Sequence, residues 1–282
     1  TTEIYTLSLH DALPISFIGP NALVEGAARI DGCTIMGSEE APVFVGAGCV
    51  LDGSILRPGC HADSQAIVAG SFLAEAARAE RQAKITESYI GPNSVIGEGE
   101  VTASFVGPFV GFHHQSLLIA AFWPGGRGNV GQGANVGSNH SSRMPDGEIW
   151  PAEGMFFGLG CNIKYPADFS SSPYSIIATG VTTLPQKVEY PFSLIVQPAE
   201  TQPEAPPAFN RLIPAWVLSD NFYAVRRGEM KFAARNKVPG TAFDSDPLGP
   251  ATMELMENAV RMLTSAGSPK NVYLPEDMPG IG

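Results

Sequence analysis

The first two-thirds of the chain repeats a six-residue pattern of apolar, glycine and small positions. Each unit begins with an apolar residue, turns at a glycine and places a small residue four positions after its start. Self-similarity at this period predicts a parallel β-helix, in which the apolar residue points into a narrow prism and the small residue fits its corner. Units of this kind are Ile18-Gly19-Pro20-Asn21-Ala22, Val45-Gly46-Ala47-Gly48-Cys49, Ile90-Gly91-Pro92-Asn93-Ser94, Val130-Gly131-Gln132-Gly133-Ala134 and Phe157-Gly158-Leu159-Gly160-Cys161.

These units resemble the hexapeptide-repeat superfamily, whose members fold as a left-handed parallel β-helix with three short strands per coil. The resemblance implies that hand, since the spacing alone does not. It also implies a trimer of the acyltransferase type. The expected fold class is therefore an all-β solenoid, a left-handed parallel β-helix with a short C-terminal helical extension.

The amino-terminal segment 1–15 does not follow the repeat. Its sequence, TTEIYTLSLHDALPI, resembles the translation of a common sequencing-library adapter, codon for codon. We expect it to be an artefact, with the protein itself beginning upstream of Ser16. The alternative is a native strand segment. In either case its histidine and aspartate are set aside as site residues.

Beyond that segment the pattern predicts three parts. Residues 16–197 form the β-helix, with inserts near 73–88, 121–129 and 142–154. The insert at 73–88 is rich in alanine and charge, which favours a short surface helix or a looped-out coil. Residues 198–218 form a proline-rich, extended connector. Residues 219–282 form the helical extension.

Two helices are expected in the extension. Ser219 or Asp220 can cap the first, which runs to about Asn236, and Pro250 can open the second. Apolar side chains recur at helical spacing in the second helix, so one face should pack on the solenoid or on a neighbouring subunit. That face comprises Met253, Met256, Val260 and Leu263.

Composition narrows the classes of function. The formal net charge of −11 argues against a general nucleic-acid binder, which carries a basic surface. No apolar run approaches the length of a membrane span. Cys49, Cys60 and Cys161 fill small-residue positions of the repeat, which favours buried structural thiols over a disulfide or zinc framework. Free thiols are typical of a reducing cytoplasm, which is the expected location.

The histidines outside the first 100 residues are His113, His114 and His140, and all lie in the polar segment 111–164. They are the candidate catalytic residues, because histidine titrates near neutral pH and acts as a general base. In a strand, adjacent residues point to opposite faces, so only one of His113 and His114 can face a given cleft. The resemblance implies a site between two subunits. N-acetylglucosamine-1-phosphate acetyltransferases have an Asn-Tyr loop where this chain has Asn139 and His140.

Polar residues of the same segment are the candidates for binding substrate. They are Gln115, Arg127, Asn129, Asn135, Asn139, Arg143, Glu148, Glu153 and Lys164. An asparagine at a corner is also ordinary turn chemistry. The run 125–128 (GGRG) can form an anion nest but lacks the lysine and hydroxyl of a P-loop.

Arg227, Lys231 and Arg235 recur at intervals of four and therefore share one face of the first helix. They are candidates for binding a phosphate of a nucleotide, coenzyme A or a sugar phosphate. The alternative is a solvated or subunit-pairing face.

Four continuous stretches resemble a bacterial family of hexapeptide-repeat proteins classified only as a domain of unknown function. They are GFHHQSLLIAA, NVGQGANVGSNH, EIWPAEGMFFGLG and LSDNFYAVRR. γ-Class carbonic anhydrases share the implied fold and bind zinc through three histidines. The histidines of this chain are not spaced as they are in those enzymes, so no metal ligand is assigned. A metal site formed by His113 or His114 together with His140 stays an alternative.

The sequence therefore predicts an acyltransferase-like enzyme. A histidine base would assist transfer of an acyl group from a coenzyme A thioester to a sugar-nucleotide or sugar-phosphate acceptor. No bound cofactor is expected, and acyl-CoA is the co-substrate. The alternative is a non-catalytic trimerising or regulatory module of a larger sugar-nucleotide protein. The expected small-molecule partner is a sugar-phosphate or nucleotide ligand, and in both cases a homotrimer is expected.

Overall fold

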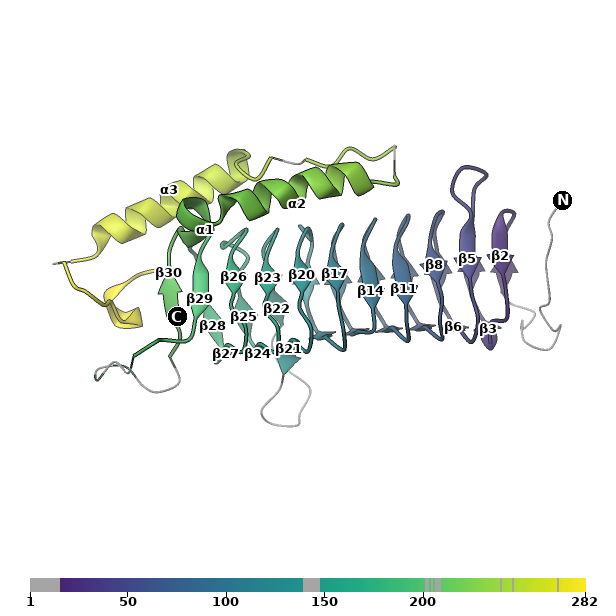
Figure 1. Ribbon diagram of the computed structural model, residues 1–282, viewed down its shortest axis with the longest axis horizontal. Helices are drawn as coiled ribbons and strands as arrows, with labels where there is room; N and C mark the ends of the chain where they lie inside the picture. The colour runs from purple at the N-terminus through teal and green to yellow at the C-terminus, as the bar shows by residue number, and fades with distance from the viewer. Residues whose placement is uncertain are drawn as a thin grey trace.

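The chain winds into a long stack of coils, with two helices lying along one edge (Figure 1). The computed structural model describes residues 16–138, 148–200, 203, 205, 209–238, 240–244, 246–267 and 269–282. The expectations for residues 1–15, Asn139, His140 and Arg143 lie outside these ranges.

Each coil contributes short strands to the faces of a prism, and the described strands form four sheets. Sheet 1 contains β1 Phe17–Ile18, β4 Thr34–Ile35, β7 Ile55–Leu56, β10 Phe72–Leu73, β13 Tyr89–Ile90, β16 Phe105–Val106 and β19 Phe122–Trp123. Sheet 2 contains β2 Ala22–Val24, β5 Val43–Val45, β8 His61–Ala62, β11 Arg78–Glu80, β14 Val95–Gly97, β17 Gly111–Phe112, β20 Asn129–Val130, β23 Phe156–Phe157, β26 Ile176–Ile177, β29 Leu194–Val196 and β30 Arg211–Ile213.

Sheet 3 contains β3 Arg29–Asp31, β6 Val50–Asp52, β9 Ile67–Ala69, β12 Lys84–Thr86, β15 Glu100–Thr102, β18 Leu117–Ile119, β21 Asn135–Ser138, β24 Asn162–Lys164 and β27 Thr182–Thr183. Sheet 4 contains β22 Ile149–Trp150, β25 Ala167–Asp168 and β28 Gln186–Lys187. Sheet 4 continues the face of sheet 1, since a bridge joins Ala121 to Ile149.

Parallel pairing at a nearly constant register confirms the all-β solenoid. Arg78 pairs with Val95, Val95 with Gly111, and Gly111 with Asn129. Side chains alternate along each strand, so one apolar residue per strand points inward. These inward residues, among them Ile96, Phe112 and Val130, are fully buried and form one continuous core.

A column of serines runs through one corner of the prism. In this column, the backbone N–H of each serine donates to the Oγ of the serine one coil before it, at 3.1 Å. The bonds run from Ser71 to Ser54, from Ser88 to Ser71 and from Ser104 to Ser88. Each of these corners therefore satisfies a buried backbone donor with a small side chain.

The segment 73–88 is not an insert. Its residues form β11 and β12, which pair with the coils on both sides. Ala77, Ala79 and Ala83 are buried there. Ala79 thus occupies the inward position that the next two coils give to Ile96 and Phe112, which weakened the repeat pattern in the sequence. The loop expected at 121–129 likewise begins and ends in paired strands, β19 and β20.

The connector is not simply extended. Within it, β30 pairs antiparallel with β29 and adds a strand to the end of sheet 2. A short helix, α1 Trp216–Asp220, follows. Helix α2 Phe222–Arg235 begins after Asn221, so neither Ser219 nor Asp220 caps it. Helix α3 Pro250–Ser265 opens at Pro250 as predicted, and a short 3₁₀ turn, η1 Pro275–Asp277, lies near the end of the chain.

The face by which α3 packs was predicted only in part. Met256 packs against the cluster of Tyr174, Phe192 and Val217, whereas Met253, Val260 and Leu263 are exposed. Its buried residues are Thr252 and Ala259, and Met262 packs against the solenoid core. Small side chains at Thr252 and Ala259 let the helix approach closely, and Met256 and Met262 contact the buried clusters beside them.

Candidate functional site

The candidate residues do not form one cluster. His113, His114, Gln115 and Asn129 lie on sheet 2 or at its corner with sheet 3. Asn135 and Lys164 lie on sheet 3, and Glu148 immediately precedes β22 of sheet 4. Arg127 and Glu153 lie at another corner, beneath α2. The outer faces of a prism point apart, so only the first group shares a surface.

Arg127 and Glu153 were predicted to bind substrate, and in the structure they lie beneath α2 and contact each other. The Arg127 side chain is only 5% exposed; it pairs with Glu229 of α2 and lies 3.4 Å from Glu153. It also donates to the backbone carbonyl of Asp244. The Arg127 backbone N–H donates to the carbonyl of Pro108, at 2.6 Å. The glycine-rich run is therefore part of the surface on which α2 docks, and the expected anion nest is not open.

His113 stands on the outer surface of sheet 2, immediately after β17. Phe112 before it is buried, so alternation directs His113 outward. The register places Gly97 beside it on one coil and Gly131 on the next. The residues in direct register with His113 on the two neighbouring coils therefore have no side chain.

Two nitrogens converge over Gly111, the residue two positions before His113. A Cβ built on Gly111 would lie 3.1 Å from Nδ2 of Asn129 and 3.5 Å from Nε2 of His113. A Cβ on Gly97 would lie only 2.4 Å from Nη2 of Arg81, so that guanidinium occupies the neighbouring space. We call the surface formed by Arg81, Gly97, Gly111, His113 and Asn129 the glycine patch.

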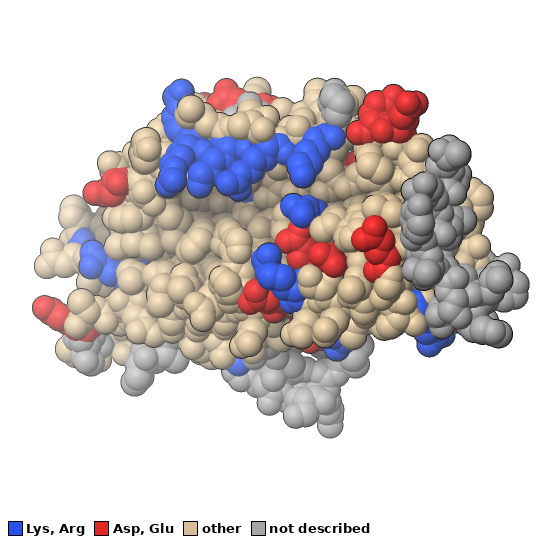
Figure 2. All heavy atoms as spheres, turned by 45° about the vertical axis from the view of Figure 1, so that its right-hand side comes forward, with Lys and Arg blue, Asp and Glu red and all other residues tan. Residues whose placement is uncertain are grey.

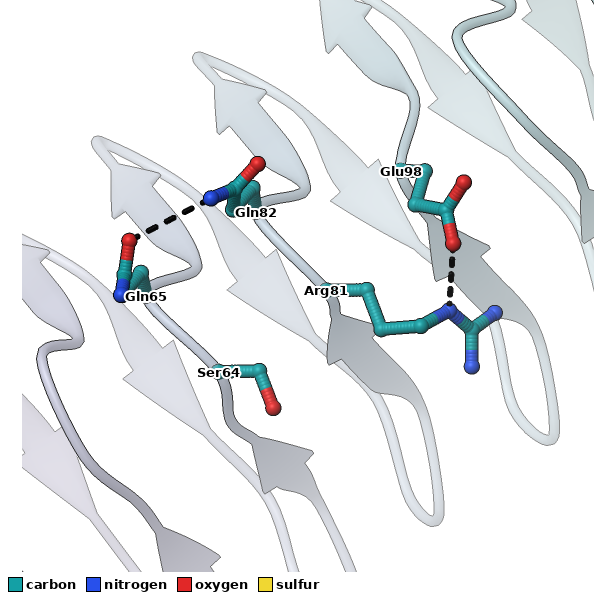
Figure 3. Close-up of a pocket in the computed structure, with 5 residues that line it drawn as sticks. All are labelled: Ser64, Gln65, Arg81, Gln82 and Glu98. Atoms are coloured by element: carbon teal, nitrogen blue, oxygen red, sulfur yellow. Dashed lines mark hydrogen bonds and ion pairs between the residues drawn. The ribbon is translucent and has the colours of Figure 1, made fainter.

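The adjoining corner is lined by polar side chains from successive coils (Figure 3). Nε of Arg81 lies 3.0 Å from Oε1 of Glu98, and Gln82 donates to Gln65 at 3.3 Å. With Ser64 these residues line a shallow depression of about 300 Å³. Nδ1 of His114 lies 2.9 Å from Oε2 of Glu98, so His114 belongs to this corner and His113 to the patch.

Burial and nearby polar groups together shift the pKa of His113. Partial burial lowers that pKa most, His114 and Arg81 lower it further, and Glu98 acts in the opposite direction. The hydrogen bond from His114 lowers the pKa of the Glu98 carboxyl, which keeps that group ionised. His113 is therefore a neutral imidazole at neutral pH, the form that accepts a proton.

The basic residues of α2 lie close to the same surface. Arg227, Lys231 and Arg235 are exposed, and Figure 2 shows Lys and Arg side chains gathered in a band above the face of the solenoid. Contacts on the opposite side of the helix join Phe232 to Phe109 and Asn236 to Asn93.

Across the described ranges, no group of three His, Cys, Asp or Glu side chains is arranged to hold a metal ion. Nor does any helix in those ranges have the length and apolar character that a bilayer crossing requires.

Arg81 and Glu98 were missed by the sequence interpretation. The sequence contains a pattern that could have identified them, since Arg81, Glu98 and Gln115 recur at intervals of one coil. Because 73–88 was interpreted as an insert, Arg81 was not recognised as part of this series of polar residues.

The fold and the glycine patch define a parallel β-solenoid protein with a polar surface site beside a docked helix. The chain belongs to the family described as Domain of unknown function (DUF4954), whose model matches residues 10–235. The match begins inside the segment 1–15. The chain is also similar to an uncharacterized protein of Treponema pallidum (strain Nichols), with 29% identity over 254 residues. That alignment covers 88% of this chain and 33% of the relative, so the chain spans about a third of its length.

Proposed function

We propose that the glycine patch supports acyl transfer, with His113 as the general base. The observation that carries the proposal is the neutral imidazole of His113. Its Nε2 lies close to Gly111, and side-chain donors of Arg81 and Asn129 lie beside it. The glycines let the polar atoms of Arg81, His113 and Asn129 lie close to the backbone, and the donors suit the oxygen atoms of an acceptor and of a reacting carbonyl.

In the proposed step, His113 takes the proton from a hydroxyl or amine of a sugar acceptor as that group attacks the thioester carbonyl of acyl-CoA. The carbon–sulfur bond breaks, the acyl group passes to the acceptor, and the thiolate of coenzyme A leaves and takes up the proton. Glu98 holds His114 to one side, so His114 is not the base in this arrangement.

The proposal predicts that His113→Gln strongly lowers the rate of transfer. Ligands are first found by thermal shift with coenzyme A, acetyl-CoA and a panel of sugar acceptors, because a ligand that binds the native state raises the melting temperature. Release of coenzyme A is then followed with a thiol reagent. Loss of a general base lowers the rate by about 10²- to 10⁴-fold.

His114→Gln is the matched control and is expected to retain the rate within a few-fold. Because the pKa of His113 is lowered, the imidazole stays neutral to below the ordinary value of about 6.5, and the rate should fall only below that pH. A His113→Gln protein with the full rate of transfer would overturn the proposal.

A second candidate function is a non-catalytic module of a longer protein. It is favoured by one observation, that the matched relative is about three times as long as the aligned segment. In that case none of the acceptors would support release of coenzyme A, while the chain would still fold and associate.

We further propose that the chain forms a homotrimer. The support is a row of apolar side chains on the outer face of sheet 1, which includes exposed Ile55, Phe105 and Phe122. Rings in that row stack from coil to coil, with centroids 4.4 Å apart for Tyr89 and Phe105. An exposed apolar row of this kind is typical of an interaction surface.

A further inference from the structure

The basic side of α2 is an unusual feature of an acidic chain. The net charge is −11, yet Arg227, Lys231 and Arg235 line one exposed side of a single helix. Within the described residues, no carboxylate forms an ion pair with any of the three. By contrast, Arg29, Lys84 and Lys270 each pair with a carboxylate within 3.1 Å. The three cations of α2 are therefore available to an external anion.

The docking of α2 fixes where these cations lie. Arg127 pairs with Glu229 on the buried side of the helix, and its guanidinium carbon lies 5.6 Å from the centre of the Phe232 ring. At the far end, Asn93 Oδ1 accepts from the backbone N–H of Lys237, at 2.9 Å. With its middle and its carboxyl end attached to the solenoid, the helix cannot turn its basic side away.

The surface beneath the basic side is uncharged. Beside α2, the outer row of sheet 2 includes Val95, Gly111, Asn129 and Phe156. Figure 2 shows the surface hollowed below the basic band, with neutral side chains lining the hollow. The acids nearest to the patch, Glu80 and Glu98, are already paired with Arg78 and Arg81. No negative charge in this described row repels an anion.

We infer that the basic side of α2 binds the diphosphate of the substrate whose reacting end lies on the glycine patch. This inference rests on the proposed function and names the substrate class, a nucleoside-diphosphate compound. Residues four apart on a helix lie roughly 6 Å apart along its axis, so two long basic side chains reach one diphosphate. Arginine adds paired donors that match phosphate oxygens.

Two compounds carry this chemistry, and the test separates them. Binding of coenzyme A and of uridine diphosphate is measured by calorimetry, with pantetheine and uridine as the phosphate-free counterparts. We expect one or both phosphate compounds to bind and the counterparts to bind more weakly. The probe that binds tells whether the acyl donor or the acceptor places its diphosphate on α2.

The decisive variant is the triple substitution Arg227→Gln, Lys231→Gln, Arg235→Gln. Removing charge-assisted hydrogen bonds should weaken binding about tenfold or more. The matched control, Arg29→Gln, Lys84→Gln, Lys270→Gln, changes the net charge equally and should bind as the unaltered chain does. Raising the salt concentration should weaken binding to the unaltered chain far more than to the α2 variant.

Three outcomes would overturn the inference: neither phosphate compound binds, the α2 variant binds as tightly as the unaltered chain, or the control weakens binding equally. The proposed function fails separately. His113→Gln should still bind the phosphate compound, since it removes the base and leaves α2 intact. If His113→Gln keeps both binding and transfer, the catalytic proposal fails and the binding site on α2 stands.

Discussion

At the scale of single residues, the cysteines illustrate how the solenoid core controls reactivity. Cys33, Cys49, Cys60 and Cys161 are all free and buried. Burial raises the pKa of Cys60 to about 12 and that of Cys161 to about 12. The thiolate is the reactive form, so at pH 8 these groups are almost entirely unreactive thiols.

We therefore predict that the native protein does not react with a disulfide reagent such as DTNB at pH 8. In guanidinium chloride, where the core is open, all four thiols counted in the sequence should react. Ala234→Cys places a thiol on the exposed side of α2 and serves as the positive control. Rapid labelling of Cys60 in the native protein would contradict this account.

The residue scale also shows what sequence interpretation can and cannot provide. His113 was found because histidines are rare in the chain, and its outward direction follows from alternation beside buried Phe112. The role of Arg127 could not be found in the same way. Its partner Glu229 lies about a hundred positions away, and neither residue carries a local signal of the pair. An arginine in a glycine-rich run therefore resembled a substrate ligand.

At the scale of elements, one buried cation connects the helix to the solenoid. Arg127 lies between Glu229 and Glu153 and accounts for much of the polar contact beneath α2. Removing one partner of a buried ion pair leaves an uncompensated charge, which costs about 3–5 kcal/mol. Because the burial of Glu153 already raises the pKa of its carboxyl, that group is sensitive to loss of the cation.

We predict that Arg127→Ala releases α2 while leaving the coils folded. Hydrogen exchange should increase over α2 and remain unchanged in the strands around Ile30 and Leu51. Arg226→Ala removes an exposed cation from the same helix and is the matched control. An Arg127→Ala protein whose α2 exchanges as slowly as that of the control would show that apolar contacts alone hold the helix.

The elements were predicted with uneven success, for a physical reason. Coils with Ile, Val or Leu at the inward position were recognised, whereas the coil with Ala79 at that position was not. The inward position requires an apolar residue that fits the prism, and alanine meets that requirement while weakening the pattern. The same weakness explains the part of α3 that was predicted wrongly, where Thr252 and Ala259 form the close contact. Hydrophobic periodicity identifies the positions of large apolar side chains. It does not identify contacts made by small residues, which close packing also uses.

At the scale of the whole molecule, the faces of the solenoid differ in character. Sheet 2 carries the glycine patch and lies beside the basic side of α2, whereas sheet 1 presents aromatic side chains. The 37% exposed Phe105 and the 38% exposed Phe122 lie on adjacent coils, with ring centroids 5.3 Å apart. Burying such a row between copies of the chain would leave sheet 2 open to substrate.

The last prediction is therefore that the chain associates as a closed trimer through sheet 1. Closed rotational symmetry is the usual arrangement of soluble homo-oligomers. Light scattering after size exclusion should give three times the chain mass of 29.7 kDa. The double variant Phe105→Glu, Phe122→Glu places charges in the apolar row and should give single chains.

The control variant is Tyr223→Glu, which changes an aromatic residue on α2 that is 77% exposed and should leave the trimer intact. Thermal unfolding by circular dichroism checks that each variant folds, and a single-chain mass for the unaltered protein at micromolar concentration would rule the trimer out.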